Sequence, residues 1–345
     1  PNTIYHLLED ENKNVIIGSD RGLYRLNNST NIFEHQNITH NKNFYEAPIV
    51  SFEGDKNGTL WLGLMSNGLL KNDEKHNQYS FYRTSSSNNK SLSSDYITKV
   101  YEDPLGTLWV ATLEGLNKMD KSSGTFTRYQ HNPLDSTSIS NNHIVNLHKD
   151  YFGSLWVSTY YGLNVLNEKN GPFRHFYKKN GLPENIIYSV IEDTQNNLWI
   201  ATKNYLSKFN PKTEKFKTFN KGNGMSINEF HPGASLKASN GKMYFGGVNG
   251  VIEFYPDSIQ NNTYTPPIVL TDFKISNQSV PIKKTESTNK KDAFLLDKNI
   301  NLLDTIRLSY LDNIFSFEFA ALDYVHSSSN QYAYRMKGFN EDWII

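Results

Sequence analysis

The stretch Val190-Ile-Glu-Asp-Thr-Gln-Asn-Asn-Leu-Trp-Ile-Ala-Thr202 decides the fold, because its pattern recurs along the chain. Its Leu-Trp pair has three counterparts, and the four tryptophans are 48, 47 and 43 residues apart, at Trp61, Trp109, Trp156 and Trp199. Similar steps place Ile16 and Tyr244 at the corresponding positions on either side. A period of this length indicates a repeat architecture, here with six repeats.

Each repeat contains the residues of a tight turn. Six residues before the tryptophans stand four aspartates, Asp55, Asp103, Asp150 and Asp193, while the first repeat has Asp10 and the sixth has Ala238. Glycine or asparagine usually follows three residues after the aspartate. A carboxylate can cap nearby backbone N–H groups, and glycine or asparagine tolerates the left-handed conformation. We therefore interpret these aspartates as turn residues that serve folding.

The residues around the turn predict short strands. Apolar residues alternate before it, and apolar Leu-Trp runs follow it. A Gly-Leu pair such as Gly115-Leu116 then begins a third segment, and an aromatic one such as Phe126–Tyr129 forms a fourth. Four antiparallel strands, a to d, in about 45 residues are typical of a β-propeller blade. The sequence predicts an all-β fold with propeller repeats over 1–257, expected to be part of a seven-bladed ring, and tryptophans that stack between blades.

The period stops near residue 257. Residues 258–267 read as a linker, and 268–345 carry strand signals at Ile268–Ile275, Ser316–Ala320 and Gln331–Met336, which suit an immunoglobulin-like β-sandwich. This module looks incomplete, and the sixth repeat lacks a fourth strand. We therefore expect the chain to be a fragment, with a segment before Pro1 supplying the missing strand.

Composition excludes several classes of function. The net charge is zero, from 35 basic and 35 acidic residues, so nothing marks a nucleic-acid or membrane surface. With no cysteine there is no disulfide, thiolate nucleophile or cysteine-ligated metal. The ten histidines lack metal-binding spacing, and no nucleotide or phosphate motif is present, so we predict neither metal nor cofactor.

The repeat resembles the two-component regulator propeller repeat, most clearly at Gly181-Leu-Pro183 and in the opening stretch. Leu308–Tyr324 and Tyr332–Trp343 look like the start of a YYY domain, an immunoglobulin-like module. This order of modules resembles the periplasmic sensor of hybrid two-component histidine kinases. The resemblance implies an oligosaccharide ligand, a homodimer through the YYY module, and kinase and membrane segments outside this chain. It implies no catalysis and no nucleic-acid binding by this segment.

A recognition surface is expected where the repeats differ. The loops joining strands b to c, and those joining d to the next a, emerge on one end of a propeller, here called the b–c face. Loops that vary on a fixed scaffold suit recognition, and sugars favour aromatic, amide and charged groups. The candidate residues on the b–c turns are Arg21, Asn67, Glu114, Tyr160, Tyr161, Lys203, Asn204, Tyr205 and Asn249.

Two other functions stay open. The propeller could be a protein-binding scaffold or dimerisation module, as propellers of the WD-repeat type are. The aspartate turns also resemble the Asp-box of sialidases, whose hydrolysis needs an arginine cluster, an activated tyrosine and an acid. Only seven arginines are present, and most fall on strands or turns of the repeat, which disfavours the hydrolase.

Overall fold

The computed structural model describes residues 2–9, 13–38, 47–55, 58–73, 75–76, 78–167, 171–220, 225–226, 229–259, 266–283, 294–323, 330 and 332–344. The chain divides into two compact units, Pro1–Ile259 and Gln260–Ile345. Each unit has hydrophobic clusters of its own.

The first unit is a β-propeller, the fold that the repeats predict. It consists of six antiparallel sheets, which we call blades 1 to 6 in chain order. Five have four strands: β1 (Ile4–Glu9), β2 (Val15–Ser19), β3 (Gly22–Asn27) and β4 (Ile32–Gln36); β5 (Ile49–Gly54), β6 (Thr59–Leu64), β7 (Gly68–Asp73) and β8 (Gln78–Tyr82); β9 (Ile97–Glu102), β10 (Leu108–Thr112), β11 (Gly115–Asp120) and β12 (Thr125–Tyr129); β13 (Ile144–Lys149), β14 (Leu155–Thr159), β15 (Gly162–Leu166) and β16 (Arg174–Phe176); β17 (Ile187–Glu192), β18 (Leu198–Thr202), β19 (Leu206–Asn210) and β20 (Lys215–Phe219). In the described residues blade 6 has three: β21 (Phe230–Lys237), β22 (Met243–Gly247) and β23 (Gly250–Phe254).

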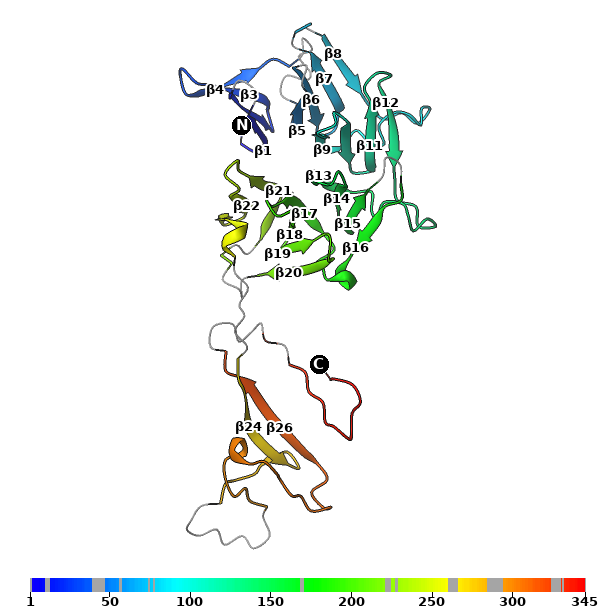
Figure 1. Ribbon diagram of the computed structural model, residues 1–345. Helices are drawn as coiled ribbons and strands as arrows, with labels where there is room; N and C mark the ends of the chain where they lie inside the picture. The colour runs from blue at the N-terminus through cyan, green and yellow to red at the C-terminus, as the bar shows by residue number, and fades with distance from the viewer. Residues whose placement is uncertain are drawn as a thin grey trace. The chain divides into compact units, whose positions relative to one another are not determined.

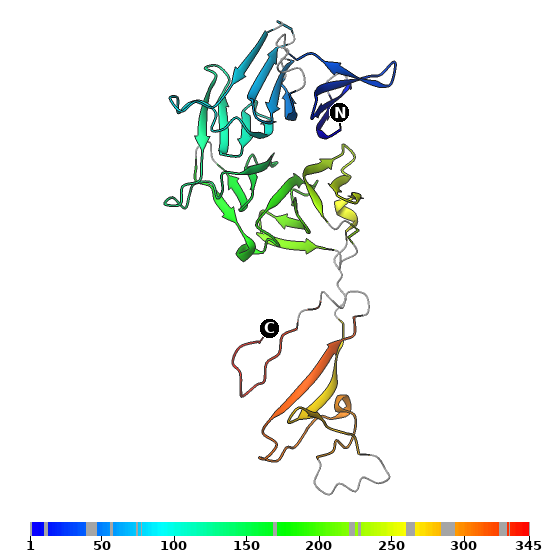
Figure 2. The ribbon, with the colours of Figure 1, turned by 180° about the vertical axis from the view of Figure 1, so that it is seen from behind.

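The first strand of each blade lies toward the middle of this unit (Figure 1). Contacts link these inner strands in order, β1 to β5, β5 to β9, β9 to β13, β13 to β17 and β17 to β21. The view from behind gives the same succession of blades (Figure 2). The b–c turns of all six blades therefore come to one end of the unit.

The repeated tryptophans fill the seams between blades. Trp61, Trp109, Trp156 and Trp199 are 0–5% exposed, and each packs against residues of the following blade. Burying an indole removes about 150–250 Å² from water. The aromatic residue of the fourth strand lies beside the indole, as Tyr129 does beside Trp109 with ring centroids 6.0 Å apart. The hydrophobic core of the propeller is thus formed by contacts between neighbouring blades.

The aspartates of blades 2 to 5 do more than cap their turns. Asp193 Oδ1 accepts hydrogen bonds from Gln195 N (2.9 Å) and Asn197 N (2.8 Å). Its other oxygen accepts one from the Trp199 indole Nε1 at 3.0 Å. The same indole bond recurs for the aspartates of blades 2, 3 and 4, at 3.3, 3.3 and 2.7 Å. One carboxylate therefore fixes both the hairpin and the tryptophan.

Blade 6 departs from this pattern at two positions together. Ala238 replaces the aspartate and Tyr244 the tryptophan, so the acceptor and its indole donor are both absent. Tyr244 is half-buried, unlike the four tryptophans. In blade 1, Ile16 is buried, whereas Asp10 lies outside the described residues.

The second unit contains one antiparallel sheet in the order β25-β24-β26, made of β24 (Ile268–Ile275), β25 (Gln278–Ser279) and β26 (Phe315–Ala321). Phe273 lies at its core and is 1% exposed. The strand expected at 331–336 does not form in residues 332–336, which make a single bridge from Tyr334 to Ile344. The second layer of a sandwich is therefore not among the described residues.

Helical structure in the described residues is limited to short 3₁₀ turns at Lys178–Asn180, Pro256–Ser258 and Ile300–Leu302. None of the helices in these described parts is long and apolar enough to cross a membrane.

Candidate ligand-binding face

In blades 1, 3 and 4 the turn between strands b and c is held by a hydroxyl at the end of strand b. Thr159 Oγ1 accepts a hydrogen bond from Tyr161 N (3.0 Å) and donates one to Gly162 O (2.8 Å). Thr112 makes the same pair with Glu114 N (3.0 Å) and Gly115 O (2.9 Å). This bonding fixes the backbone of the turn and leaves the side chains between hydroxyl and glycine free to vary.

The b–c turns contact the loops that connect blades. Tyr160 N donates to His143 O at 3.2 Å, and Gly162 N donates to Asn185 O at 2.6 Å. His143 precedes blade 4 and Asn185 precedes blade 5, so this turn contacts the loop on each side. Equivalent bonds recur in other blades, as from Gly115 N to Asn142 O at 2.8 Å. The two kinds of loop therefore share one face, as their positions in the repeat require.

Each blade places at least one predicted site residue on this face. Seven are exposed, whereas two are half-buried: the exposed ones are Arg21, Glu114, Tyr160, Tyr161, Lys203, Asn204 and Asn249, and the half-buried ones are Asn67 and Tyr205. Tyr161 is 54% exposed and is not packed inside the blade.

Blades 4 to 6 bring some of these residues together. Asn204 Nδ2 donates to Glu184 Oε1 at 3.0 Å. Lys203 Nζ forms an ion pair with Glu229 Oε1 at 3.5 Å. Tyr160 packs on the His143 ring with centroids 3.7 Å apart, and Tyr161 lies 5.6 Å from the Tyr177 ring. Exposed tyrosines, an amide, two carboxylates and an ammonium thus share one part of the face.

Tyr188, on β17, interacts electrostatically with several residues of this group. Burial raises the pKa of its phenol, and nearby Tyr160, Glu229 and Glu184 raise it further while Lys203 lowers it. Burial also lowers the pKa of His143. The phenol of Tyr188 and the imidazole of His143 therefore both favour their uncharged forms, which can still form hydrogen bonds.

Three residues that interact with the predicted site residues were not predicted from the sequence: Glu184, Tyr188 and Glu229. They lie in the segments just before blades 5 and 6 or on an inner strand, where the repeat gives no sign of a neighbour. Of the other predicted residues, Tyr205 is half-buried on the b–c turn of blade 5, and four lie on separate blades: Arg21, Asn67, Glu114 and Asn249.

A second group of titratable residues lies on the inner strands of blades 1 to 3. His6 Nε2 is 2.9 Å from Lys99 Nζ, and Phe52 N donates to His6 Nδ1 at 3.2 Å. Burial and the nearby Lys99 lower the pKa of His6 to about 3. Burial raises the pKa of Glu53 to about 7, against the effect of Lys99. The inner strands of blades 1, 2 and 3 are thus joined by half-buried polar contacts.

The described part of the chain contains no group of three or more histidine, aspartate or glutamate side chains able to hold an ion.

Comparison with known proteins connects these repeats to a family. The two-component regulator propeller model matches residues 91–114 and 181–204. A stretch of 118 residues, 34% of this chain, is 42% identical to histidine kinase P4 of Formosa agariphila and covers 8% of that protein. The chain is therefore a β-propeller protein. The two matched segments include the a–b hairpins of blades 3 and 5, which resemble the two-component regulator propeller repeat.

Solved structures share the fold. The extracellular domain of one putative hybrid two-component system from B. thetaiotaomicron matches with a TM-score of 0.79 and 24% identity, over 99% of this chain and 44% of that one. A second such domain from the same organism matches with a TM-score of 0.52 and 20% identity, over 99% of this chain and 63% of that one. The chain thus spans less than half of the first of these proteins and less than two thirds of the second.

Proposed function

We propose that this chain is part of the extracytoplasmic ligand-sensing region of a hybrid two-component histidine kinase, with an oligosaccharide bound on the b–c face. The 42% identity to a protein named histidine kinase carries this proposal, because that stretch lies in a chain with two-component regulator propeller repeats. The kinase reaction then belongs to parts of the protein outside this chain, and the sensor faces the periplasm.

The make-up of the b–c face supports a sugar ligand. Sugars present C–H faces that pack on aromatic rings and hydroxyls that bond amides and carboxylates. Tyr160 and Tyr161 are 40% and 54% exposed, and Asn204 and Glu184 lie on the neighbouring blade. Rigid turns hold these groups, so binding requires little ordering of the backbone.

The second unit has the role of a relay in this proposal. It resembles the start of a YYY module, which would lie next to the membrane and make the contacts of a homodimer. Ligand binding would then change the pairing of two sensors, because a ligand favours the state that it binds more tightly.

Calorimetric titration with plant, host and microbial oligosaccharides tests the ligand. We expect one class to bind saturably, and Tyr161→Ala to weaken its binding at least about tenfold, as loss of a stacked ring costs about 1–3 kcal/mol in comparable sites. Tyr151→Ala is the matched control, because Tyr151 is 78% exposed on the same blade but on the a–b turn at the opposite end.

Equal weakening by Tyr161→Ala and Tyr151→Ala would remove the b–c face as the site. Absence of binding to every oligosaccharide, by this chain and by the full sensor region, would favour a protein-binding scaffold. Binding by the full region alone would place the ligand at an interface that this chain lacks.

A further inference from the structure

A lysine covers the seam tryptophan in blades 2, 3 and 5. It is the residue of strand c that pairs with the tryptophan across the ladder: Lys71 with Trp61, Lys118 with Trp109 and Lys208 with Trp199. The ammonium lies 5.7, 5.7 and 5.6 Å from the respective ring centroid. Cations are attracted to the face of an indole at such distances.

The aspartate beside each of these tryptophans also has a lysine partner. Asp193 pairs with Lys208 of its own strand c at 3.3 Å. The other two take a lysine from the following blade: Lys149 lies 2.7 Å from Asp103, and Lys121 lies 3.8 Å from Asp55. Three positions in the repeat can therefore supply the ammonium.

Blade 4 has a cation at none of the three. Val165 stands opposite Trp156 in the strand ladder, where the other blades have lysine. Glu192 occupies the position of Lys149, and Pro211 that of Lys121, in the blade that follows. No ion pair or cation–π contact joins Asp150 or Trp156 to a lysine or arginine of the described residues.

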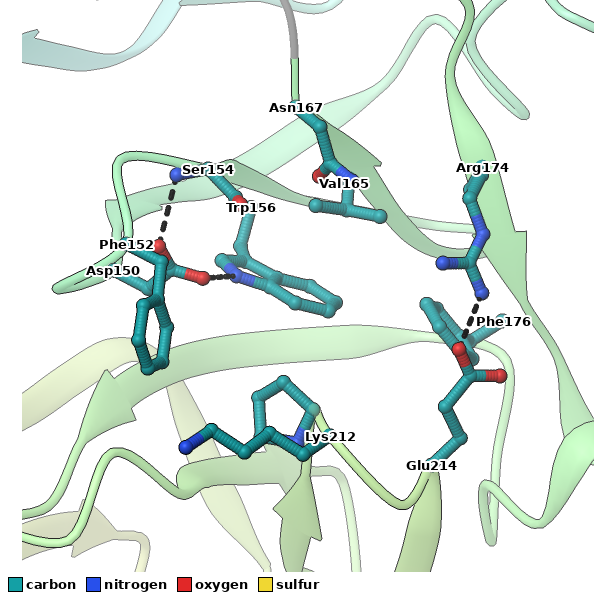
Figure 3. Close-up of a pocket in the computed structure, with 11 residues that line it drawn as sticks. Asp150, Phe152, Ser154, Trp156, Val165, Asn167, Arg174, Phe176, Lys212 and Glu214 are labelled. Carbon is teal, nitrogen blue, oxygen red and sulfur yellow. Dashed lines mark hydrogen bonds and ion pairs between the residues drawn. The ribbon is translucent and has the colours of Figure 1, made fainter.

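A cavity lies where the ammonium is missing. It has a volume of about 240 Å³ and lies between the a–b turn of blade 4 and the c–d turn of blade 5. Figure 3 shows Val165 above the Trp156 ring and Asp150 at the indole nitrogen. Asp150 is 7% exposed and Trp156 is 4% exposed. A buried carboxylate and an aromatic ring thus line the same open cavity.

The two cations that line this cavity have other partners. Arg174 is 2.7 Å from Glu214 across the mouth, and its guanidinium lies over the Phe176 ring at 5.4 Å. Lys212 has its ammonium 5.4 Å from the Phe152 ring centroid. Neither pairs with Asp150, so the negative charge of Asp150 is not balanced by an ion pair among the described residues.

We propose that this cavity binds a small organic ammonium. The ligand packs on Trp156 and pairs with Asp150, as lysine does with the equivalent residues of blades 2, 3 and 5. The ligand is a primary amine on an aliphatic or alicyclic carrier, such as an amino sugar or free lysine. A buried carboxylate favours a cation, and the ring adds cation–π attraction. The volume left by valine in place of lysine accommodates the carbon chain. This site lies on the end opposite the b–c face and is independent of the sugar site.

The test uses n-butylammonium, which has the atoms of a lysine side chain. The whole chain is labelled with 5-fluorotryptophan, and its five tryptophan signals are followed by ¹⁹F NMR, with that of Trp156 assigned from Trp156→Phe. We expect the Trp156 signal alone to shift and to saturate. Neutral n-butanol at equal concentration should bind at least about tenfold more weakly, since it lacks the charge.

Two variants separate charge from space. Val165→Lys places an intrachain ammonium in the cavity and should abolish binding, whereas Val165→Ala keeps the cavity open and should retain it. Asp150→Asn should weaken binding about tenfold or more. If Asp150→Asn does not fold, Val165→Lys alone tests the proposal.

Amines compared with their N-acetylated forms show which carbon skeleton the ligand has. They also test the need for a positive charge a second time. Glucosamine and lysine amide should each bind more tightly than their N-acetylated forms. Parallel linear shifts of all five tryptophans, equal binding of butanol, or undiminished binding by Val165→Lys would overturn the proposal.

Discussion

At the scale of single residues, Asp103 links local and long-range structure. Burial acts to raise the pKa of Asp103, but hydrogen bonds from Lys149, Thr107 and Trp109 outweigh it and lower the pKa below its usual value. The ionised carboxylate is therefore the form that the fold stabilises. It connects a turn, the indole of its own blade and a lysine of the next.

The first prediction concerns Trp109, which is 5% exposed in the seam between blades 3 and 4. Trp109→Ala should lower the free energy of unfolding by about 3–5 kcal/mol, because it leaves a cavity and removes the donor to Asp103. Urea denaturation measures the change. Leu105→Ala in the same blade, where Leu105 is 82% exposed, should change stability by less than about 0.5 kcal/mol. A midpoint for Trp109→Ala that matches the wild type would contradict the burial.

The second prediction concerns pH and the His6 group. The folded pKa of His6 is lowered to about 3, so the unfolded chain binds more protons between pH 6.5 and 3, and stability falls as the pH falls through this window. Glu53 acts in the opposite sense, since its pKa is raised to about 7 and its contribution is lost as the pH rises from 4.5 to 7. Lys99 of β9 faces both His6 of β1 and Glu53 of β5, and Glu102 adds a like charge to Glu53.

His6→Gln separates these opposing effects. Between pH 7.5 and pH 5, the variant should gain about 2 kcal/mol of stability relative to the wild type, because it no longer keeps an imidazole neutral. Urea denaturation at several pH values measures the difference. A constant gap between variant and wild type over this range would show that His6 titrates normally.

At the scale of elements, the strands and their order follow from the period-two pattern and the turn residues. The Gly-Leu pair predicts where strand c begins, since β11 and β15 start at Gly115 and Gly162. The hydroxyl that fixes the b–c turn of blades 1, 3 and 4, as Thr159 does, was not predicted, because one threonine in a strand is compatible with many roles. Partners from distant parts of the chain, such as His6 and Lys99, require the folded ring to become neighbours.

A third prediction compares two glycines with positive φ. Gly115 has φ of 121°, and a Cβ there would lie 2.6 Å from Tyr129 O. Gly153 has φ of 87°, with no atom within 4 Å of such a Cβ. Gly115→Ala should cost about 1–3 kcal/mol more than Gly153→Ala, because it adds a steric clash to the backbone strain that both share. Thermal unfolding of both variants provides the measurement, and equal losses would show that the backbone of the b–c turn yields to the clash.

At the scale of the molecule, the sequence predicts the propeller because each blade repeats the same core contacts. It predicts less about the site. The loop positions follow from the repeat, but Tyr160 of blade 4 and Glu229 before blade 6 become neighbours of Tyr188 only through packing between blades. The cavity beside Trp156 was not foreseen either, although Val165, Glu192 and Pro211 mark it once the strand register is known. Comparison of the repeats at the three positions that supply the lysine would therefore have indicated this cavity.

The last prediction is that the two units unfold separately. Their hydrophobic clusters share no residue: Phe273 lies in that of the second unit, and Phe245 lies in that of blade 6. Both are at most 1% exposed, so replacement by alanine should cost about 3–5 kcal/mol in the unit concerned. Hydrogen exchange with mass spectrometry can locate the effect, because protection reports local stability. Phe273→Ala should speed exchange in β24 and β26 and leave β18 and β22 unchanged, whereas Phe245→Ala should do the reverse. Faster exchange in both units after either change would show that the two cores unfold as one.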